Sequence, residues 1–169
     1  MAVRKVLLYP DPVLKRVCAP APEGDELAQV IADLTDTMRS FPGCVGIAAP
    51  QIGYEYRVAV IDLTGHKKAP PNVHGLLALV DPEVAAQDGS IVAREGCLSI
   101  PQLTADVRRA ENARVRVRGG EEFDFEGFEA RCVLHELDHL DGLLFLDRVE
   151  SLTRDVFPRK TGKPQPKNK

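Results

Sequence analysis

The sequence predicts an α+β fold in which mostly antiparallel β-strands pack around a central helix carrying the pattern H-E-x-x-H, with a second, amphipathic helix near the amino terminus. Two observations support this prediction. Apolar residues recur at helical spacing in two stretches, 25–38 and about 127–140. Short apolar runs rich in β-branched residues lie between them, separated by turns that contain Gly or Pro. The length of 169 residues allows one domain with a buried core.

The first predicted helix carries an apolar stripe from Leu27 to Met38, with Asp25 as its N-cap. It should end near Ser40, because a Pro-Gly pair follows. Residues 44–53 are small and too irregular for a helix or a strand. An exposed loop that holds two of the four histidines is expected at 64–75. Strands are predicted at 56–63, 76–84, 90–95, 113–118 and 123–125.

The second helix is predicted from about Gly127 to Leu140, with Gly142 placed to end it. Residues 143–149 should form a short strand or an extended segment. The chain then becomes polar and basic with repeated prolines, a composition that does not favour a packed core. We therefore expect a single domain at 1–150, followed by a largely disordered tail at 151–169.

The composition favours a cytoplasmic protein without a nucleic-acid or membrane partner. The net charge is −3, and no stretch approaches the roughly 20 apolar residues of a membrane span. The apolar run at the amino terminus is too short for a signal peptide. Cysteines in the cytoplasm are reduced, so they are interpreted as core residues, metal ligands or reactive thiols rather than disulfides: Cys18, Cys44, Cys97 and Cys132.

The pattern with the clearest chemistry is the H-E-x-x-H segment at 135–139. Residues four apart lie on one face of a helix, so His135 and His139 can hold one divalent ion with Glu136 beside it. Such an ion activates water, and the carboxylate serves as a general base. Two histidines on an apolar helix face can also be core residues. A third candidate ligand is therefore needed to distinguish a metal site from core packing.

Cys97 is the preferred third ligand. A third histidine of the metzincin type is excluded because Phe145 occupies its position. Glu150 lies closer to the helix than the downstream glutamate ligand that is usual in thermolysin-like enzymes, although spacing alone does not exclude Glu150 as a ligand. Cys132 shares the helix face but lies roughly 7.5 Å along the axis from the expected ion, which is too far. Cys97 follows a strand and a glycine, and a Cys/His/His set leaves a fourth position for water, as in catalytic sites.

Three segments, CVGIAAPQ at 44–51, EGCLS at 95–99 and HELDH at 135–139, together resemble the three signature motifs of the peptide deformylase family. The similarity extends from about residue 8 to residue 148. It implies that residues 1–150 form a deformylase-like catalytic domain. Such a domain removes the N-formyl group from the initiator methionine of nascent chains, an amino-terminal modification in protein biosynthesis.

The resemblance also implies roles for individual residues. Glu136 would take a proton from the attacking water and return it to the departing amine. The Gln51 side chain and the Leu98 N–H would donate hydrogen bonds to the developing oxyanion. Fe²⁺ would be the native ion, with Zn²⁺, Ni²⁺ or Co²⁺ as substitutes, and the ligands would be Cys97, His135 and His139. An N-formylmethionyl peptide would bind as an added strand along Val45, Gly46, Glu95 and Gly96.

This chain departs from the family pattern in four places. Cys44 stands where the first motif usually begins with Gly, and Leu134 replaces the usual Gln before the H-E-x-x-H pattern. Residues 102–104 lack the Arg often found there in bacterial members, so contacts to the peptide should differ. The tail lacks the long carboxy-terminal helix of many bacterial members. A transient ribosome association, which the resemblance allows, is therefore not expected to use the tail.

Two other function classes remain as alternatives. One is a different metallohydrolase, such as a peptidase, which the Glu-Gly-Cys-Leu-Ser segment and the missing downstream ligand disfavour. The other is a non-catalytic relative that only binds a metal or a peptide. The intact Glu136 and Gln51 argue against it.

Overall fold

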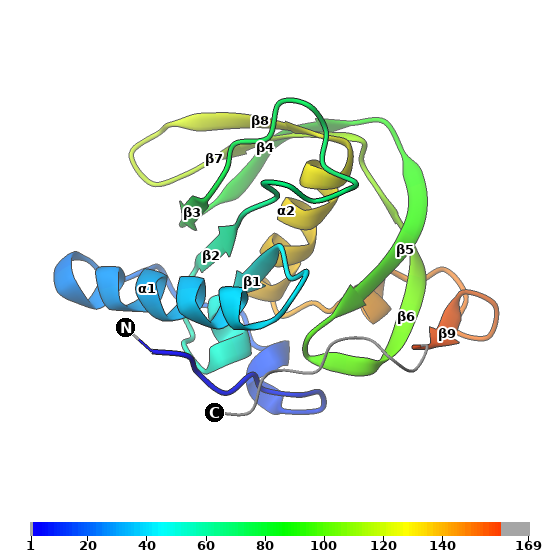
Figure 1. The fold of residues 1–169 in the computed structure, drawn as a ribbon, viewed down its shortest axis with the longest axis horizontal. Helices are drawn as coiled ribbons and strands as arrows, with labels where there is room; N and C mark the ends of the chain where they lie inside the picture. Colours follow the sequence, from blue (N-terminus) through cyan, green and yellow to red (C-terminus); the bar gives the residue numbers. More distant parts are fainter. Residues whose placement is uncertain (1, 160–169) are drawn as a thin grey trace.

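The computed structural model describes residues 2–159, in which three antiparallel three-stranded sheets are arranged around helix α2 (Gly127–Leu140) (Figure 1). Every residue of α2 from Glu129 to Leu140 is buried. The helix contacts strands of two of the sheets directly. The α+β prediction with a central H-E-x-x-H helix is therefore confirmed. None of the helices within residues 2–159 is long and apolar enough to cross a membrane.

Helix α1 (Gly24–Ser40) is the predicted amphipathic helix, and it packs against the first sheet. Its buried face includes Val30, Leu34 and Met38, spaced four residues apart as the stripe required. The predicted N-cap is wrong. Glu23 occupies that position, and its side chain makes no capping hydrogen bond.

The first sheet has the strand order β1-β2-β3, with β1 at one edge. Its strands are β1 (Gly46–Ala48), β2 (Val58–Ile61) and β3 (Leu77–Val80). The prediction that residues 44–53 form neither strand nor helix is wrong in the centre of this segment, because β1 is followed by the 3₁₀ helix η2 (Ala49–Ile52). Strand β1 has only three residues, and it is defined by its distant partner β2, with Ile47 opposite Val60. A local pattern cannot reveal such a pairing.

The second sheet has the order β4-β7-β8. Its strands are β4 (Glu83–Asp88), β7 (Asn112–Arg116) and β8 (Glu122–Glu126). The single strand predicted at 76–84 is wrong, since the chain leaves β3 and enters a different sheet through Asp81. This residue has a φ of 48°, which Asp tolerates better than most residues. Its carboxylate accepts a hydrogen bond from the Ala21 N–H at 2.7 Å, which holds the bend.

The third sheet has the order β5-β6-β9, and β5 and β6 form a long curved ribbon along one side of the molecule (Figure 1). Its strands are β5 (Ile91–Cys97), β6 (Ile100–Arg109) and β9 (Val156–Pro158). The expectation of a disordered tail from residue 151 is wrong for 151–159. Strand β9 pairs with β6 there, with Phe157 opposite Thr104. The rest of that prediction concerns 160–169, which lie outside the described residues.

Two further 3₁₀ turns complete the chain, η1 (Pro12–Lys15) and η3 (Phe145–Arg148). The extended segment predicted at 143–149 is therefore wrong, because the Asp147 carboxylate accepts a hydrogen bond from the Leu144 N–H at 2.8 Å and stabilises a turn. Gly142 follows the end of α2 with a φ of 75°. A Cβ at this position would lie 2.7 Å from the Lys15 carbonyl oxygen, so the close approach of η1 requires glycine.

Candidate active site

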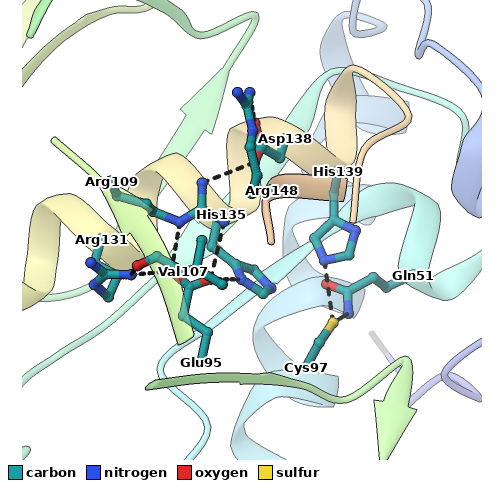
Figure 2. Close-up of polar contacts among 10 residues, drawn as sticks. All are labelled: Gln51, Glu95, Cys97, Val107, Arg109, Arg131, His135, Asp138, His139 and Arg148. Atoms are coloured by element: carbon teal, nitrogen blue, oxygen red, sulfur yellow. Dashed lines mark hydrogen bonds and ion pairs between the residues drawn. The ribbon is translucent and has the colours of Figure 1, made fainter. Parts of the chain in front are cut away.

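Three potential metal ligands meet where α2 passes the end of β5 (Figure 2). His135 and His139 lie one turn apart on the helix, and Cys97 is the last residue of β5. One ligand atom from each residue lies within 4.8 Å of the others, and Cys97 Sγ is 3.4 Å from His139 Nε2. Cys132 packs in a separate apolar cluster, as expected. The structure thus assembles the predicted set, while the role of these residues as ligands stays a prediction.

The chemistry of these donors suits a divalent transition metal. A thiolate and two neutral imidazoles are ligands that Fe²⁺ and Zn²⁺ accept, and a set of three leaves room for water. The Nδ1 atom of His135 is already engaged by Glu95, so Nε2 is the ring nitrogen free to bind an ion. Within residues 2–159 the buried Nδ1 atom of His139 has no hydrogen-bond partner.

Glu95 anchors His135 through a buried ion-pair network. Its carboxylate lies 2.9 Å from His135 Nδ1 and accepts two hydrogen bonds from Arg109, at 2.6 and 3.0 Å. Arg131 donates to the same carboxylate. Burial alone would raise the pKa of Glu95, but the hydrogen bonds from His135 and Arg109 outweigh it and hold the pKa well below its usual range. Glu95 therefore stays ionised and fixes the orientation of the His135 ring.

This network continues away from the metal site, from Arg109 to Asp138 and on to Arg148 (Figure 2). Arg109 donates to Asp138 at 2.9 Å, and Arg148 donates to the same carboxylate at 2.9 Å. Sequence reasoning used only the backbone of Glu95 and overlooked this network. The network joins β5, β6 and α2, and the spacing of residues along the chain does not show that these elements are in contact. The residues of the network could therefore not be found from the sequence.

Glu136 is buried beside the candidate ligands, and its Oε1 atom has no hydrogen-bond partner within residues 2–159. Burial raises the pKa of this carboxyl to about 7, which suits a group that both accepts and returns a proton. Gly46 of β1 leaves the space that the Glu136 carboxylate occupies. A Cβ on Gly46 would lie 2.7 Å from Glu136 Oε2, so any larger residue would push against the carboxylate.

Gln51 on η2 lies beside Cys97. Its Oε1 atom accepts a hydrogen bond from the Ala48 N–H at 3.0 Å, which fixes the amide orientation. Its Nε2 atom then donates to Ser99 Oγ at 3.1 Å and lies 3.5 Å from Cys97 Sγ. Leu98, the other predicted oxyanion donor, occupies the turn between β5 and β6, directly after Cys97.

The residues predicted to bind substrate lie on or beside two sheet edges. Gly46 belongs to β1, and Val45 directly precedes it. Glu95 and Gly96 belong to β5. Both β1 and β5 are edge strands of their sheets. Each therefore has one side without a neighbouring strand within residues 2–159, and such an edge can pair with an extended peptide.

Comparison with known proteins decides the family. The family model described as polypeptide deformylase matches residues 3–155. The chain belongs to the polypeptide deformylase family. It is 40% identical to the peptide deformylase of Syntrophobacter fumaroxidans over 167 residues, which cover 95% of this chain and 94% of that protein. It is also 40% identical to the enzyme of Alkalilimnicola ehrlichii, over 96% of this chain and 91% of that protein.

Solved deformylase structures share the fold. The crystal structure of a peptide deformylase from Legionella pneumophila has a TM-score of 0.77 and 39% identity, covering 90% of this chain and 89% of that one. The class I type b deformylase of Acinetobacter baumannii bound to Met-Ala-Ser has a TM-score of 0.75 and 33% identity. That match covers 88% of this chain and all of that one.

Two departures of this deformylase from the family motifs lie close to the site. Cys44 is half-buried, and its thiol donates to the Gly46 carbonyl at 3.3 Å. Burial raises the pKa of this thiol to about 12, so it stays protonated near neutral pH. Leu134 packs into the apolar cluster around α2. Both side chains have apolar surroundings, and neither makes a polar contact with the candidate ligands.

Proposed function

We propose that this deformylase releases formate from the N-formylated initiator methionine of nascent chains, using a divalent ion held by Cys97, His135 and His139. The observation that carries the proposal is the meeting of these three donors beside Glu136, whose buried Oε1 atom has no hydrogen-bond partner within residues 2–159. A bound cation would act as a Lewis acid, polarising the formyl carbonyl and acidifying a water ligand. We propose Fe²⁺ as the native ion, with Zn²⁺, Ni²⁺ or Co²⁺ as substitutes that the same donors accept.

The remaining steps belong to side chains of this chain. Glu136 accepts the proton of the attacking water and later delivers it to the departing α-amine, so the formyl C–N bond breaks with a neutral leaving group. Gln51 Nε2 and the Leu98 N–H donate to the oxyanion that develops on the formyl oxygen. The hydrogen bond from Ala48 supports this role of Gln51, because it turns the amide nitrogen toward Cys97.

The substrate would bind as an extended strand between the edges of β1 and β5. The edge positions of both strands within residues 2–159 support this mode, and the Acinetobacter baumannii relative binds the peptide Met-Ala-Ser. A nascent-chain substrate places the reaction in the cytoplasm and next to the ribosome. We propose that any association with the ribosome is transient.

Formate release from formyl-Met-Ala-Ser tests the proposal. We expect turnover by protein purified anaerobically and loaded with Fe²⁺, measured with a coupled formate assay. Acetyl-Met-Ala-Ser would yield acetate instead of formate, so its hydrolysis is followed by the free α-amine, and none should appear because the extra methyl group fills the space next to the attacked carbon. A chelator should stop turnover, and added Fe²⁺ should restore it. Absence of release by protein that holds one equivalent of metal would contradict the proposal.

Air should inactivate the iron form. Fe²⁺ and the Cys97 thiolate are both oxidisable, and oxidation of either removes the cation or one of its ligands. We expect a much shorter half-life of activity in air than under nitrogen, and a smaller difference for protein loaded with Zn²⁺, in which only the Cys97 thiolate can be oxidised. The measurement is residual activity against time for both metal forms. Equal half-lives of the iron form in air and under nitrogen would contradict iron as the native ion.

A further inference from the structure

The outward face of the sheet β5-β6-β9 carries a cation that has no carboxylate partner within residues 2–159. This cation is Arg159, the residue directly after β9. Its N–H donates to the Gln102 carbonyl at 2.8 Å, which fixes the backbone beside β6. Its Nε atom is buried and has no hydrogen-bond partner in the described part of the chain. The backbone of Arg159 is therefore held in place, and its guanidinium charge has no carboxylate partner among residues 2–159.

The guanidinium lies over Gly96, at the edge of the sheet that faces the proposed substrate. A Cβ on Gly96 would overlap Arg159 Nη2 and would lie 3.2 Å from its Cζ. The same Cβ would lie 3.5 Å from Cγ2 of Thr104, the residue opposite Gly96 on β6. Arg159 therefore extends from β9 across β6 to β5. The absence of a side chain at Gly96 makes room for it.

The neighbouring charges on this face already have partners. Arg94, two residues before Gly96, donates to Asp106 at 2.8 Å, and its guanidinium lies 3.8 Å from the ring centroid of Phe157. A negative group brought to this part of β5 would therefore meet Arg159, a cation that has no carboxylate partner in the described part of the chain.

Strand alternation determines which substrate residue would reach Arg159. Glu95 and Cys97 point inward from β5, whereas Gly96 lies on the outward face. In a peptide added to β5, the apolar methionine side chain favours the inward side, where Val45 and Phe128 pack against the cluster that contains Cys132. The next side chain must then point outward, to the face that carries Arg159.

We propose that Arg159 determines specificity at the second residue of the nascent chain, favouring Asp or Glu there and disfavouring Lys or Arg. The inference rests on the proposed function, because it needs the formylated peptide to bind along β5. It adds a residue from the carboxy-terminal segment, outside the three motifs, to the substrate-binding surface.

The test compares three amidated peptides, formyl-Met-Glu-Ser, formyl-Met-Gln-Ser and formyl-Met-Lys-Ser, with the full-length, metal-loaded enzyme. Amidation leaves the second side chain as the only place where a carboxylate occurs. An ion pair exposed to solvent has a modest effect, so we expect kcat/KM to be about threefold higher for Glu than for Gln. The ratio between Glu and Lys should be on the order of tenfold and should shrink at high salt.

Variants separate specificity from folding. Arg159→Gln should bring the three kcat/KM values together, and Arg159→Glu should reverse their order. Arg154→Gln serves as the matched control, since Arg154 is exposed, pairs with Asp155 and should leave the ratios unchanged. If Arg159 has only a structural role, the Arg159 variants should have lower kcat/KM values for all three peptides by the same factor, with unchanged ratios. That result would overturn the inference. Equal values for the three peptides in the unmodified enzyme would also overturn it. Failure to release formate from the Gln peptide would instead refute the proposed function.

Discussion

Replacement of Glu136 by alanine is expected to lower kcat by ~10³-fold while the enzyme keeps its metal. The carboxylate is the proposed proton acceptor, and its Oε1 atom has no other hydrogen-bond partner within residues 2–159. The three candidate ligands lie on other side chains, so metal content should stay near one equivalent. The measurements are formate release under saturating formyl-Met-Ala-Ser and metal analysis of the same preparation.

Glu136→Gln refines this experiment, because it keeps the shape of the side chain and removes only the basic oxygen. It should be as inactive as Glu136→Ala. Burying a carboxylate with an unsatisfied oxygen, as Oε1 is within residues 2–159, costs free energy, so neither substitution should lower the stability of the metal-free protein substantially. Glu121→Ala, at an exposed turn, is the control and should retain full activity. Normal turnover by either Glu136 variant would refute the proposed mechanism.

Replacement of Glu95 by glutamine is expected to reduce the free energy of unfolding by ~3–5 kcal/mol. This carboxylate is buried and paired with Arg109 and Arg131, so its loss leaves two buried guanidinium groups without their main partner. It also removes the anionic partner of His135 Nδ1. Losing such support typically lowers metal affinity by about 10- to 100-fold.

Urea unfolding of the chelator-treated protein separates the two effects of Glu95→Gln, since the stability change then does not include metal binding. A competition titration with a metal chelator measures the affinity. Glu83→Gln is a matched control, because Glu83 makes an exposed ion pair with Arg116 and should change stability by less than ~1 kcal/mol. Unfolding of Glu95→Gln at the same urea concentration as the unmodified enzyme would show that the network does not stabilise the fold.

Local sequence patterns predicted the elements whose signals lie within one segment. Both long helices were predicted within a few residues of their observed bounds, because each has an apolar stripe and a Gly or Pro near its end. Strands β5, β7 and β8 were also found, since their residues are β-branched or alternate with polar ones. Helix spacing predicted that His135 and His139 meet, because residues four apart on a helix share a face, and the resemblance of the three motifs to the deformylase family predicted that Cys97 joins them.

Strand β6 shows why other elements were overlooked. It is the longest strand, yet its sequence contains Pro101 and several polar residues, and its inward positions include Arg109. That arginine is buried only because Glu95 and Asp138 neutralise it. Since those partners lie on β5 and α2, no local pattern could mark residue 109 as an inward position.

The sequence by itself predicted the chemistry of this protein, because His135 and Glu136 lie in a motif whose spacing follows from helix geometry and Cys97 lies in a second motif of the deformylase family. Only the tertiary structure decided how those side chains are supported and what else surrounds the substrate edge. It paired Glu95 with two arginines, and it paired β9 with β6 so that Arg159 lies over Gly96. These contacts join residues 14 to 63 positions apart, and they form only when separate sheets pack and buried charges must find partners.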